Sequence, residues 1–159
     1  MQNTPLVSII IPNYNSQQYI KETLNSVTAQ IYSNWEVCIC DDASSNEETL
    51  EFLRQFVTST KNVKIKFSQI NQNISKTTNL AVEFADGEFL AFVDHDDEIT
   101  SDALYEVVKK INQDPNIDAI YSDQDKINEF GEKSEPFYKP DLSEKICHPG
   151  LVFIKFAFE

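Results

Sequence analysis

The sequence predicts an α/β fold in which a largely parallel sheet is flanked by helices. From Leu6 to Tyr121, short apolar runs alternate with segments whose apolar residues recur at helical spacing, and this alternation is typical of strands joined by crossover helices. The first run, 6–11, is almost continuously apolar and rich in β-branched residues, which favours a strand buried on both faces. The length of 159 residues is that of one domain.

Strands are predicted wherever a short apolar run ends in a turn signal. Pro12 is expected to end the first strand, because proline lacks the N–H that a strand ladder needs. The third run alternates apolar and polar residues, so we expect a more exposed strand there. After the last of these runs, 122–140 is expected to be extended or looped. The predicted strands are 6–11, 35–40, 63–67, 89–93 and 117–121, with 151–154 returning to the sheet.

Each helix is predicted from apolar residues that recur every three or four positions. These residues are Ile20, Leu24, Val27 and Ile31, then Leu50, Leu53 and Val57, then Leu80, Ala81 and Phe84, and last Leu104, Val107, Val108 and Ile111. Serine and threonine are good N-caps, and a Ser followed three residues later by Glu forms a capping box. We therefore expect caps at Ser16, at Ser45 with Glu48, at Ser75, and at Thr100 or Ser101.

Composition narrows the classes of function. Asp and Glu number 26 against 13 Lys and Arg, so the formal net charge is −13, and such a surface repels nucleic-acid backbones and anionic lipid. We expect no nucleic-acid partner, whereas peripheral membrane association through missing parts or partners stays open. Cys38, Cys40 and Cys147 are interpreted as reduced core residues rather than zinc ligands. The expected location is the cytoplasm, including the inner face of the membrane.

The strand 89–93 runs directly into an acidic cluster. Seven acidic residues and no Lys or Arg stand between Asp86 and Asp102. In open parallel sheets ligands bind just outside the carboxyl ends of the strands, and carboxylates crowded there suit Mg²⁺ or Mn²⁺, which in turn hold phosphate oxygens. The alternative is a polar turn that caps the following helix.

Glycine-rich phosphate cradles are missing from the sequence. After the first strand the chain reads Pro12-Asn13-Tyr14-Asn15 instead of Gly-x-Gly-x-x-Gly, and only three glycines occur in the whole sequence. Neither a dinucleotide-binding fingerprint nor a P-loop is present. An anionic ligand would therefore be held in another way, and a metal at Asp94 and Asp96 meets that need.

Several motifs in order resemble the family 2 glycosyltransferases. They are 7–15, Asp41-Asp42-Ala43-Ser44, 71–79, 85–89, 94–98, 121–126 and 136–141, and the last three are similar to polysaccharide and O-antigen transferases. The resemblance implies a GT-A type, Rossmann-like, mostly parallel sheet and an inverting transfer of sugar. It also implies a UDP- or dTDP-sugar donor, Mn²⁺ or Mg²⁺, and a glycan or lipid-linked acceptor in surface polysaccharide synthesis.

Carried over by motif, the resemblance assigns roles to five residues. Pro12 and Tyr14 would border the nucleobase, and Asp42 would accept a hydrogen bond from a base N–H. Asp94 would meet the ribose or the metal, and Asp96 would ligate the metal at the diphosphate. The alternatives are turn packing for Tyr14 and a helix N-terminal acid for Asp42.

The segment before the central strand carries weaker assignments. Ser75 and Asn79 would support the site, although helix capping and local backbone bonding explain them equally well. Asn73 stands where the family often has Gly, and Asn tolerates a positive φ. Thr78 replaces a commonly basic residue, which removes one phosphate partner.

An inverting transferase also needs a general base for the acceptor hydroxyl. No match to the family's catalytic carboxylate is found before Glu159, although Asp123 and Asp125 are candidates. We therefore expect 1–159 to be a nucleotide-sugar-binding domain truncated on the acceptor side. The alternatives are a non-catalytic nucleotide-sugar or metal-binding module and a receiver-like phosphoacceptor domain, which is disfavoured because the acidic pair follows the second strand.

Overall fold

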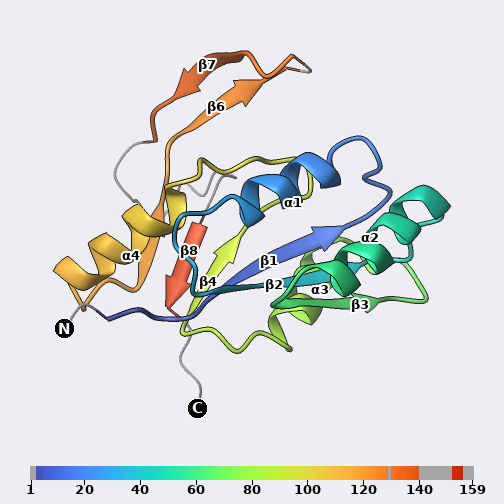
Figure 1. Ribbon diagram of the computed structural model, residues 1–159, viewed down its shortest axis with the longest axis horizontal. Coiled ribbons are helices and arrows are strands. Elements are labelled where there is room, and N and C mark those ends of the chain that lie inside the picture. The colour runs from blue at the N-terminus through green and yellow to red at the C-terminus, as the bar shows by residue number, and fades with distance from the viewer. Residues whose placement is uncertain (1–2, 129, 140–151, 156–159) are drawn as a thin grey trace.

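The computed structural model describes residues 3–128, 130–139 and 152–155, and it contains a six-stranded sheet between helices (Figure 1). The strand order is β3-β2-β1-β4-β8-β5. The first four strands are mutually parallel, and β8 runs antiparallel between β4 and β5. The predicted α/β class is confirmed. The strands are β1 (Val7–Asn13), β2 (Trp35–Asp41), β3 (Val63–Phe67), β4 (Phe89–Phe92), β5 (Ala119–Tyr121) and β8 (Val152–Lys155).

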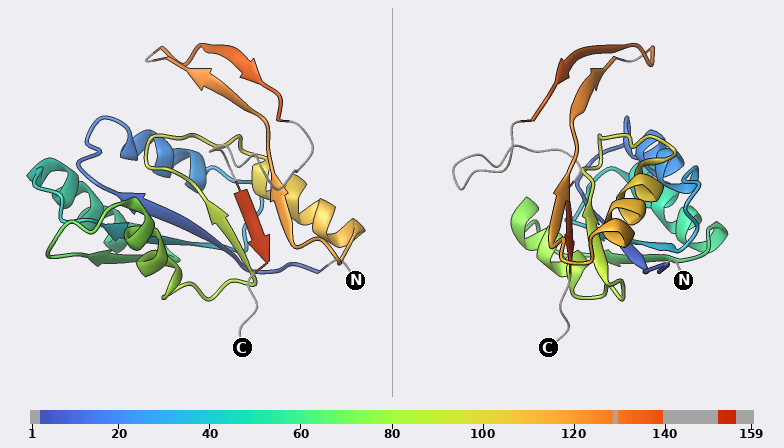
Figure 2. Two further views of the ribbon diagram at one scale, coloured as in Figure 1. Left: turned by 180° about the vertical axis from the view of Figure 1, so that it is seen from behind. Right: turned by 90° about the vertical axis from the view of Figure 1, so that its left-hand side faces the viewer.

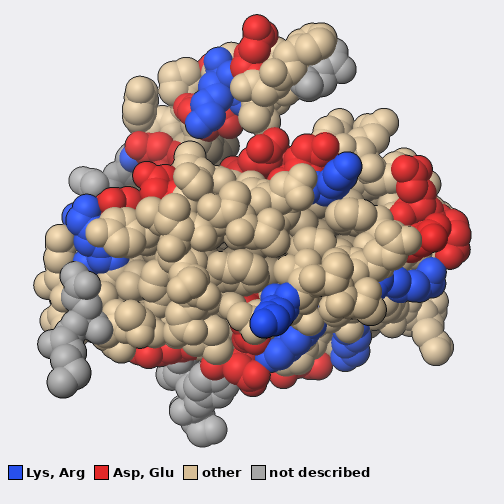
Figure 3. All heavy atoms as spheres, in the orientation of Figure 1, with Lys and Arg blue, Asp and Glu red and all other residues tan. Residues whose placement is uncertain are grey.

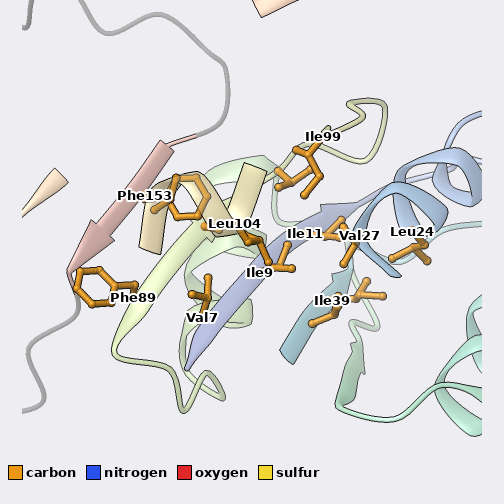
Figure 4. Close-up of a cluster of buried hydrophobic side chains, with 14 of the residues drawn as sticks. Val7, Ile9, Ile11, Leu24, Val27, Ile39, Phe89, Ile99, Leu104 and Phe153 are labelled. Atoms are coloured by element: carbon orange, nitrogen blue, oxygen red, sulfur yellow. The ribbon is translucent and has the colours of Figure 1, made fainter. Parts of the chain in front are cut away.

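The helices cover the two faces of the sheet unequally. Figure 2 shows α1 (Ile20–Thr28), α2 (Glu47–Ser59) and α4 (Ala103–Gln113) on one face and α3 (Ile74–Val82) on the other. The larger core lies under the three helices (Figure 4) and the smaller one lies under α3. Alternate residues of β1 serve both cores, so the prediction that this strand is buried on both faces is confirmed. The larger core includes Val7, Ile9, Ile11, Leu24, Leu104 and Phe153, and the smaller one includes Ile10, Cys38, Cys40, Ala81 and Leu90.

Pro12 lies inside β1, so the prediction that it ends the strand was wrong. The amide of Val93 donates to the carbonyl of Ile10 (3.1 Å), which shows that Ile10 faces β4. Residues two apart face the same neighbour, so Pro12 faces the same side, where β4 has already ended at Phe92. Because no β4 residue lies beside Pro12, the missing N–H of proline does not remove a hydrogen bond from the sheet.

The strand near the end of the chain enters the sheet rather than extending its edge. β8 pairs with β4 through Phe89↔Lys155 to Phe92↔Val152 and with β5 on its other side. Phe153 is 2% exposed and belongs to the larger core. The predicted return at 151–154 is confirmed for 152–154, whereas Leu151 and Cys147 lie outside the described residues.

The predicted helix caps were wrong at all four helices, and α4 begins after Asp102 rather than after Thr100 or Ser101. α2 is capped by Asn46, whose side-chain oxygen accepts a hydrogen bond from the Thr49 amide (2.8 Å). α1 begins after Tyr19 and α3 after Asn73, without a side-chain cap in either helix. Ser16 instead donates its hydroxyl to the side chain of Asn13. Ser75 is inside α3, and Ile31 is 64% exposed beyond the end of α1.

The segment expected to be extended or looped folds as a hairpin. β6 (Gln124–Ile127) and β7 (Lys133–Phe137) form a separate two-stranded sheet that stands off the main sheet (Figure 1). Its residues are exposed, and an ion pair joins Lys126 to Glu135 (2.5 Å). The hairpin lies above the edge of the sheet where β4 leads into α4. In the part of the chain that the structure describes, no helix is long and apolar enough to cross a membrane.

Gly87 precedes β4 at a position where the neighbouring backbone leaves no room for a side chain. A Cβ at this position would lie 2.5 Å from the Ser8 hydroxyl oxygen and 2.8 Å from the Leu6 carbonyl oxygen. Overpacking of a dense interior costs about 1–3 kcal/mol, so Gly87→Ala should lower the free energy of unfolding by that amount in urea titrations. Glu88→Ala, at the exposed neighbouring position, should change stability little. Equal stability of the two variants would show that the backbone of Leu6–Ser8 moves to accommodate the added methyl group.

Candidate functional site

A cavity of about 440 Å³ opens at the carboxyl ends of β1 and β2. The loop after β1 supplies Pro12 and Tyr14 to its wall, and the loop after β2 supplies Asp42. His95, which follows β4, completes the wall on another side. Three of the predicted site residues therefore share one cavity. The other lining residues are Asn13, Asn71, Asn73, Ile74 and Thr77.

Buried polar side chains join the loops after β1 and β2. The Asn13 side-chain amide donates to Asp41 (2.7 Å), and the other carboxylate oxygen of Asp41 accepts the Ser44 amide (3.0 Å). The side-chain oxygen of Asn15 accepts the amides of Ser45 and Asn46 at 2.9 and 3.2 Å. Asp41 is thus a structural residue, and these bonds hold the loop that carries Tyr14.

Asp42 connects the second loop to the segment before α3. Its side chain is 3% exposed, and its two oxygens accept the amides of Gln72 (2.8 Å) and Asn73 (2.9 Å). Asn73 has a φ of 70°, so the expectation that Asn tolerates a positive φ at this position is confirmed. Each carboxylate oxygen can accept a second hydrogen bond, which leaves Asp42 able to bind a donor in the cavity.

Polar side chains of α1 and of the segment just after it hold the loop between β4 and α4, whose residues 94–98 we call the acidic turn. The Thr23 hydroxyl donates to the His95 carbonyl (2.8 Å), and the Ser26 hydroxyl accepts the Ile99 amide (3.1 Å). Gln30 donates to the Thr100 carbonyl (2.7 Å) and accepts from the Leu104 amide (3.0 Å). Thr23 and Ser26 lie on α1, and Gln30 follows its end. The spacing of these polar residues among the apolar ones was the available signal, and the sequence analysis did not use it.

The acidic turn concentrates negative charge next to this cavity. Desolvation by burial, followed by the charge of Asp96, raises the pKa of Asp94, while His95 lowers it. The pKa of Asp97 is raised first by desolvation and then by Asp94 and Asp96, against opposing effects of His95 and Lys139. A bound cation would relieve both effects, because it favours the ionised carboxylates.

The donor set of the turn fits a hard divalent cation. Mg²⁺ is usually held by one or two carboxylates together with phosphate oxygens, and Mn²⁺ also prefers carboxylate oxygens. Asp94 and Asp96 supply such a pair. Among the residues that the structure describes, no group of three or more His, Cys, Asp or Glu side chains is placed to hold a metal. An ion bound by this pair would take its remaining ligands from a phosphate-bearing molecule and water.

A second cavity, of about 530 Å³, lies between the acidic turn, α4 and the β6–β7 hairpin. Asp96 and Asp97 line one side of it, and Asp123 and Asp125 line the other. Figure 3 shows acidic side chains along the edge of the molecule that faces the hairpin. The predicted metal ligand Asp96 therefore stands at the second cavity, while His95, one residue earlier, lines the first.

Ser75 and Asn79 lie on α3, and both are exposed. Neither lines the first cavity, which α3 reaches through Ile74 and Thr77. Their supporting role stays a prediction. Thr78, where a basic residue was expected, donates its hydroxyl to the Ile74 carbonyl (2.8 Å) within the same helix.

The comparisons with known proteins agree on one family. The model of glycosyl transferase family 2 matches residues 8–156. The O-antigen biosynthesis protein RfbC of Myxococcus xanthus is 28% identical over 144 residues, which are 90% of this chain and 11% of RfbC. The chain spans between 11% and 40% of the length of the curated relatives compared with it.

Two solved structures share the fold. The crystal structure of S. aureus TarS 1-349 in complex with UDP-GlcNAc has a TM-score of 0.63 and 34% identity, covering 67% of this chain and 31% of that one. The mannosyltransferase PcManGT from Pyrobaculum calidifontis, in complex with GDP-Man and Mn²⁺, has a TM-score of 0.67 and 25% identity, covering 74% and 35%. The expected GT-A type of sheet is confirmed, and the chain belongs to glycosyltransferase family 2.

Proposed function

We propose that this chain binds the donor of an inverting, metal-dependent sugar transfer from a UDP- or dTDP-sugar to a growing surface polysaccharide or other glycan acceptor. The observation that carries the proposal is the meeting of Pro12, Tyr14 and Asp42 in one cavity beside the turn that holds Asp94 and Asp96. The groups proposed to bind the base and those proposed to bind the phosphates would thus be neighbours, as a nucleoside diphosphate requires.

The first cavity suits a nucleobase. Tyr14 is 47% exposed at its wall, so the ring offers a face on which a base can stack. Asp42 is positioned by the Gln72 and Asn73 amides, so it can accept a base N–H without further ordering. The acceptor for that bond is in place before the ligand arrives, which lowers the entropic cost of binding.

The acidic turn suits the diphosphate end of the donor. Asp94 and Asp96 would hold Mn²⁺ or Mg²⁺, which would neutralise charge on the nucleoside diphosphate as it leaves. The bonds from Thr23, Ser26 and Gln30 to the turn hold it against the mutual repulsion of its carboxylates. The likeness to PcManGT, whose solved complex contains Mn²⁺, supports this assignment.

A thermal-shift screen tests the proposal. UDP, dTDP, GDP and ADP are added to the chain with and without Mn²⁺, and the melting temperature is recorded. A ligand that binds only the folded state stabilises it by RT ln(1 + L/Kd), where L is the ligand concentration, so the melting temperature rises with both ligand concentration and affinity. We expect a Mn²⁺-dependent increase with UDP or dTDP. No increase with any nucleotide would contradict the proposal, whereas binding without turnover would favour a non-catalytic nucleotide-sugar module.

The base-binding role of Asp42 makes a separate prediction. Asp42→Ala should weaken the binding of UDP or dTDP about 10- to 100-fold, because a hydrogen bond to a charged group contributes about 1.5–3 kcal/mol. The loss should be the same with and without Mn²⁺ in isothermal titration calorimetry, since the bond is to the base. Glu48→Gln, an exposed residue of α2, is the control and should bind normally. A loss that occurs only with Mn²⁺ would assign Asp42 to the diphosphate instead.

A further inference from the structure

Ile74, the first residue of α3, is an exposed apolar side chain in the wall of the first cavity. It is 58% exposed, and it lines this cavity together with Tyr14, which is 47% exposed. Single exposed apolar residues are common on protein surfaces. Here, however, two large ones share one cavity whose other lining side chains are mainly polar. Apolar surface beside a few polar groups in a cavity is typical of a site that a small molecule covers.

Tyr14 and Ile74 belong to segments that lead to opposite faces of the sheet. Tyr14 lies in the loop from β1 to α1, and Ile74 begins α3. Figure 2 shows α1 on one face of the sheet and α3 on the other. The cavity at the carboxyl ends of β1 and β2 is therefore bounded by one exposed apolar side chain from each side.

Hydrogen bonds to Asp42 set the position of Ile74. The two carboxylate oxygens of Asp42 accept the amides of Gln72 (2.8 Å) and Asn73 (2.9 Å). The Thr77 hydroxyl donates to the Asn73 carbonyl (3.0 Å), so the residue directly before Ile74 is held at its amide and at its carbonyl. The carboxylate proposed to bind the base thus also holds the segment that presents Ile74.

We propose that Ile74 covers the face of the nucleobase that Tyr14 leaves open, an inference that rests on the proposed function. A base has two flat faces, and the Tyr14 ring can stack on only one of them. The side chain of Ile74 forms no hydrogen bonds, so it contributes by burying apolar surface and does not distinguish one base from another. Ile74 is therefore a binding residue for the base and has no role at the diphosphate.

The test compares Ile74→Ala with Ile70→Ala, which removes the same side chain from a position that is 69% exposed and lines neither cavity. Calorimetry is performed with UDP and dTDP in the presence of Mn²⁺, with uridine and thymidine, and with pyrophosphate and Mn²⁺. Ile74→Ala should weaken the binding of nucleoside diphosphates and nucleosides by the same factor, about 3- to 10-fold for a partly buried aliphatic side chain. Pyrophosphate binding should not change. Ile74→Leu should retain most of the affinity, because its apolar area is similar, and Ile70→Ala should bind as the native chain does.

The melting temperature without ligand separates binding from folding. Because Ile74 is exposed in the free chain, Ile74→Ala should melt at nearly the same temperature as the native chain. Failure of the native chain to bind any nucleoside diphosphate would overturn the proposed function and this inference together. Unchanged affinity of Ile74→Ala for UDP and dTDP would overturn this inference alone. A loss that extends equally to pyrophosphate would also overturn it, since such a loss does not come from a contact with the base.

Discussion

Asp96→Ala is expected to abolish the Mn²⁺-dependent part of nucleoside diphosphate binding while the chain stays folded. Asp96 is exposed in the turn after β4 and makes no hydrogen bond that supports the fold among the described residues. Its loss removes one of the two carboxylates proposed to hold the ion. Because an ion of this kind is held by one or two carboxylates and by phosphate, removing one leaves too few protein ligands. Calorimetry of UDP or dTDP with and without Mn²⁺ measures the effect.

The same variant should be more stable than the native chain when no ligand is present. Desolvation by burial and then the charge of Asp96 raise the pKa of Asp94, so the folded chain holds the Asp94 proton more tightly than the unfolded chain does, and removing Asp96 removes the second of these effects. Such a shift destabilises the folded state at neutral pH, and the cost disappears as pH falls below the unfolded value of about 3.9. The gain in melting temperature should thus be present at pH 7 and absent near pH 3.

Glu98→Gln is the matched control for Asp96→Ala. It removes one negative charge from the same exposed turn without removing a proposed ligand. Normal Mn²⁺-dependent binding by Glu98→Gln, together with its loss in Asp96→Ala, would assign the ion to Asp96. If both variants bind normally, the metal lies elsewhere. If both lose binding equally, the turn attracts the ion only through its overall charge.

The features that periodicity controls were predictable from the sequence. The strands and the apolar helix faces follow from which side chains must be buried, and Val27, Leu53 and Leu104 all lie in the larger core as expected. The caps were not predictable in this way, because a cap depends on local φ and ψ. Asn46 caps α2 although Ser45 has the better motif.

The site residues that follow the ends of strands could be predicted from the sequence. The hydrogen bonds that join one loop of the site to another could not. Asp42 and Asp96 follow strands, so the parallel topology alone places them at one edge of the sheet. The bonds from Asp42 to the Gln72 and Asn73 amides join segments 30 residues apart in the chain. No local pattern encodes such a pairing.

We expect this chain to transfer sugar slowly, and this is the second large effect. An inverting transfer needs a carboxylate that takes the proton from the acceptor hydroxyl, and losing such a base costs about 10²- to 10⁴-fold in rate. The hairpin side offers Asp123 and Asp125. Asp123 is occupied by the Lys139 amide (2.8 Å), and Asp125 lies 3.9 Å from the Lys133 amine. Both make bonds within the hairpin segment, so we propose that neither of them is the general base and that another carboxylate supplies it.

The measurement is the release of nucleoside diphosphate from a UDP- or dTDP-sugar with a panel of glycan acceptors. The chain of 159 residues should bind the donor but turn it over about 10²- to 10⁴-fold more slowly than a longer version that carries a catalytic carboxylate on the acceptor side. Asp123→Asn and Asp125→Asn are the controls, and neither should lower the rate of the longer version by more than a few fold. Equal turnover by the short and longer chains would contradict the proposal. A loss of about 10²-fold or more in one of the two variants, with donor binding intact, would identify that residue as the base.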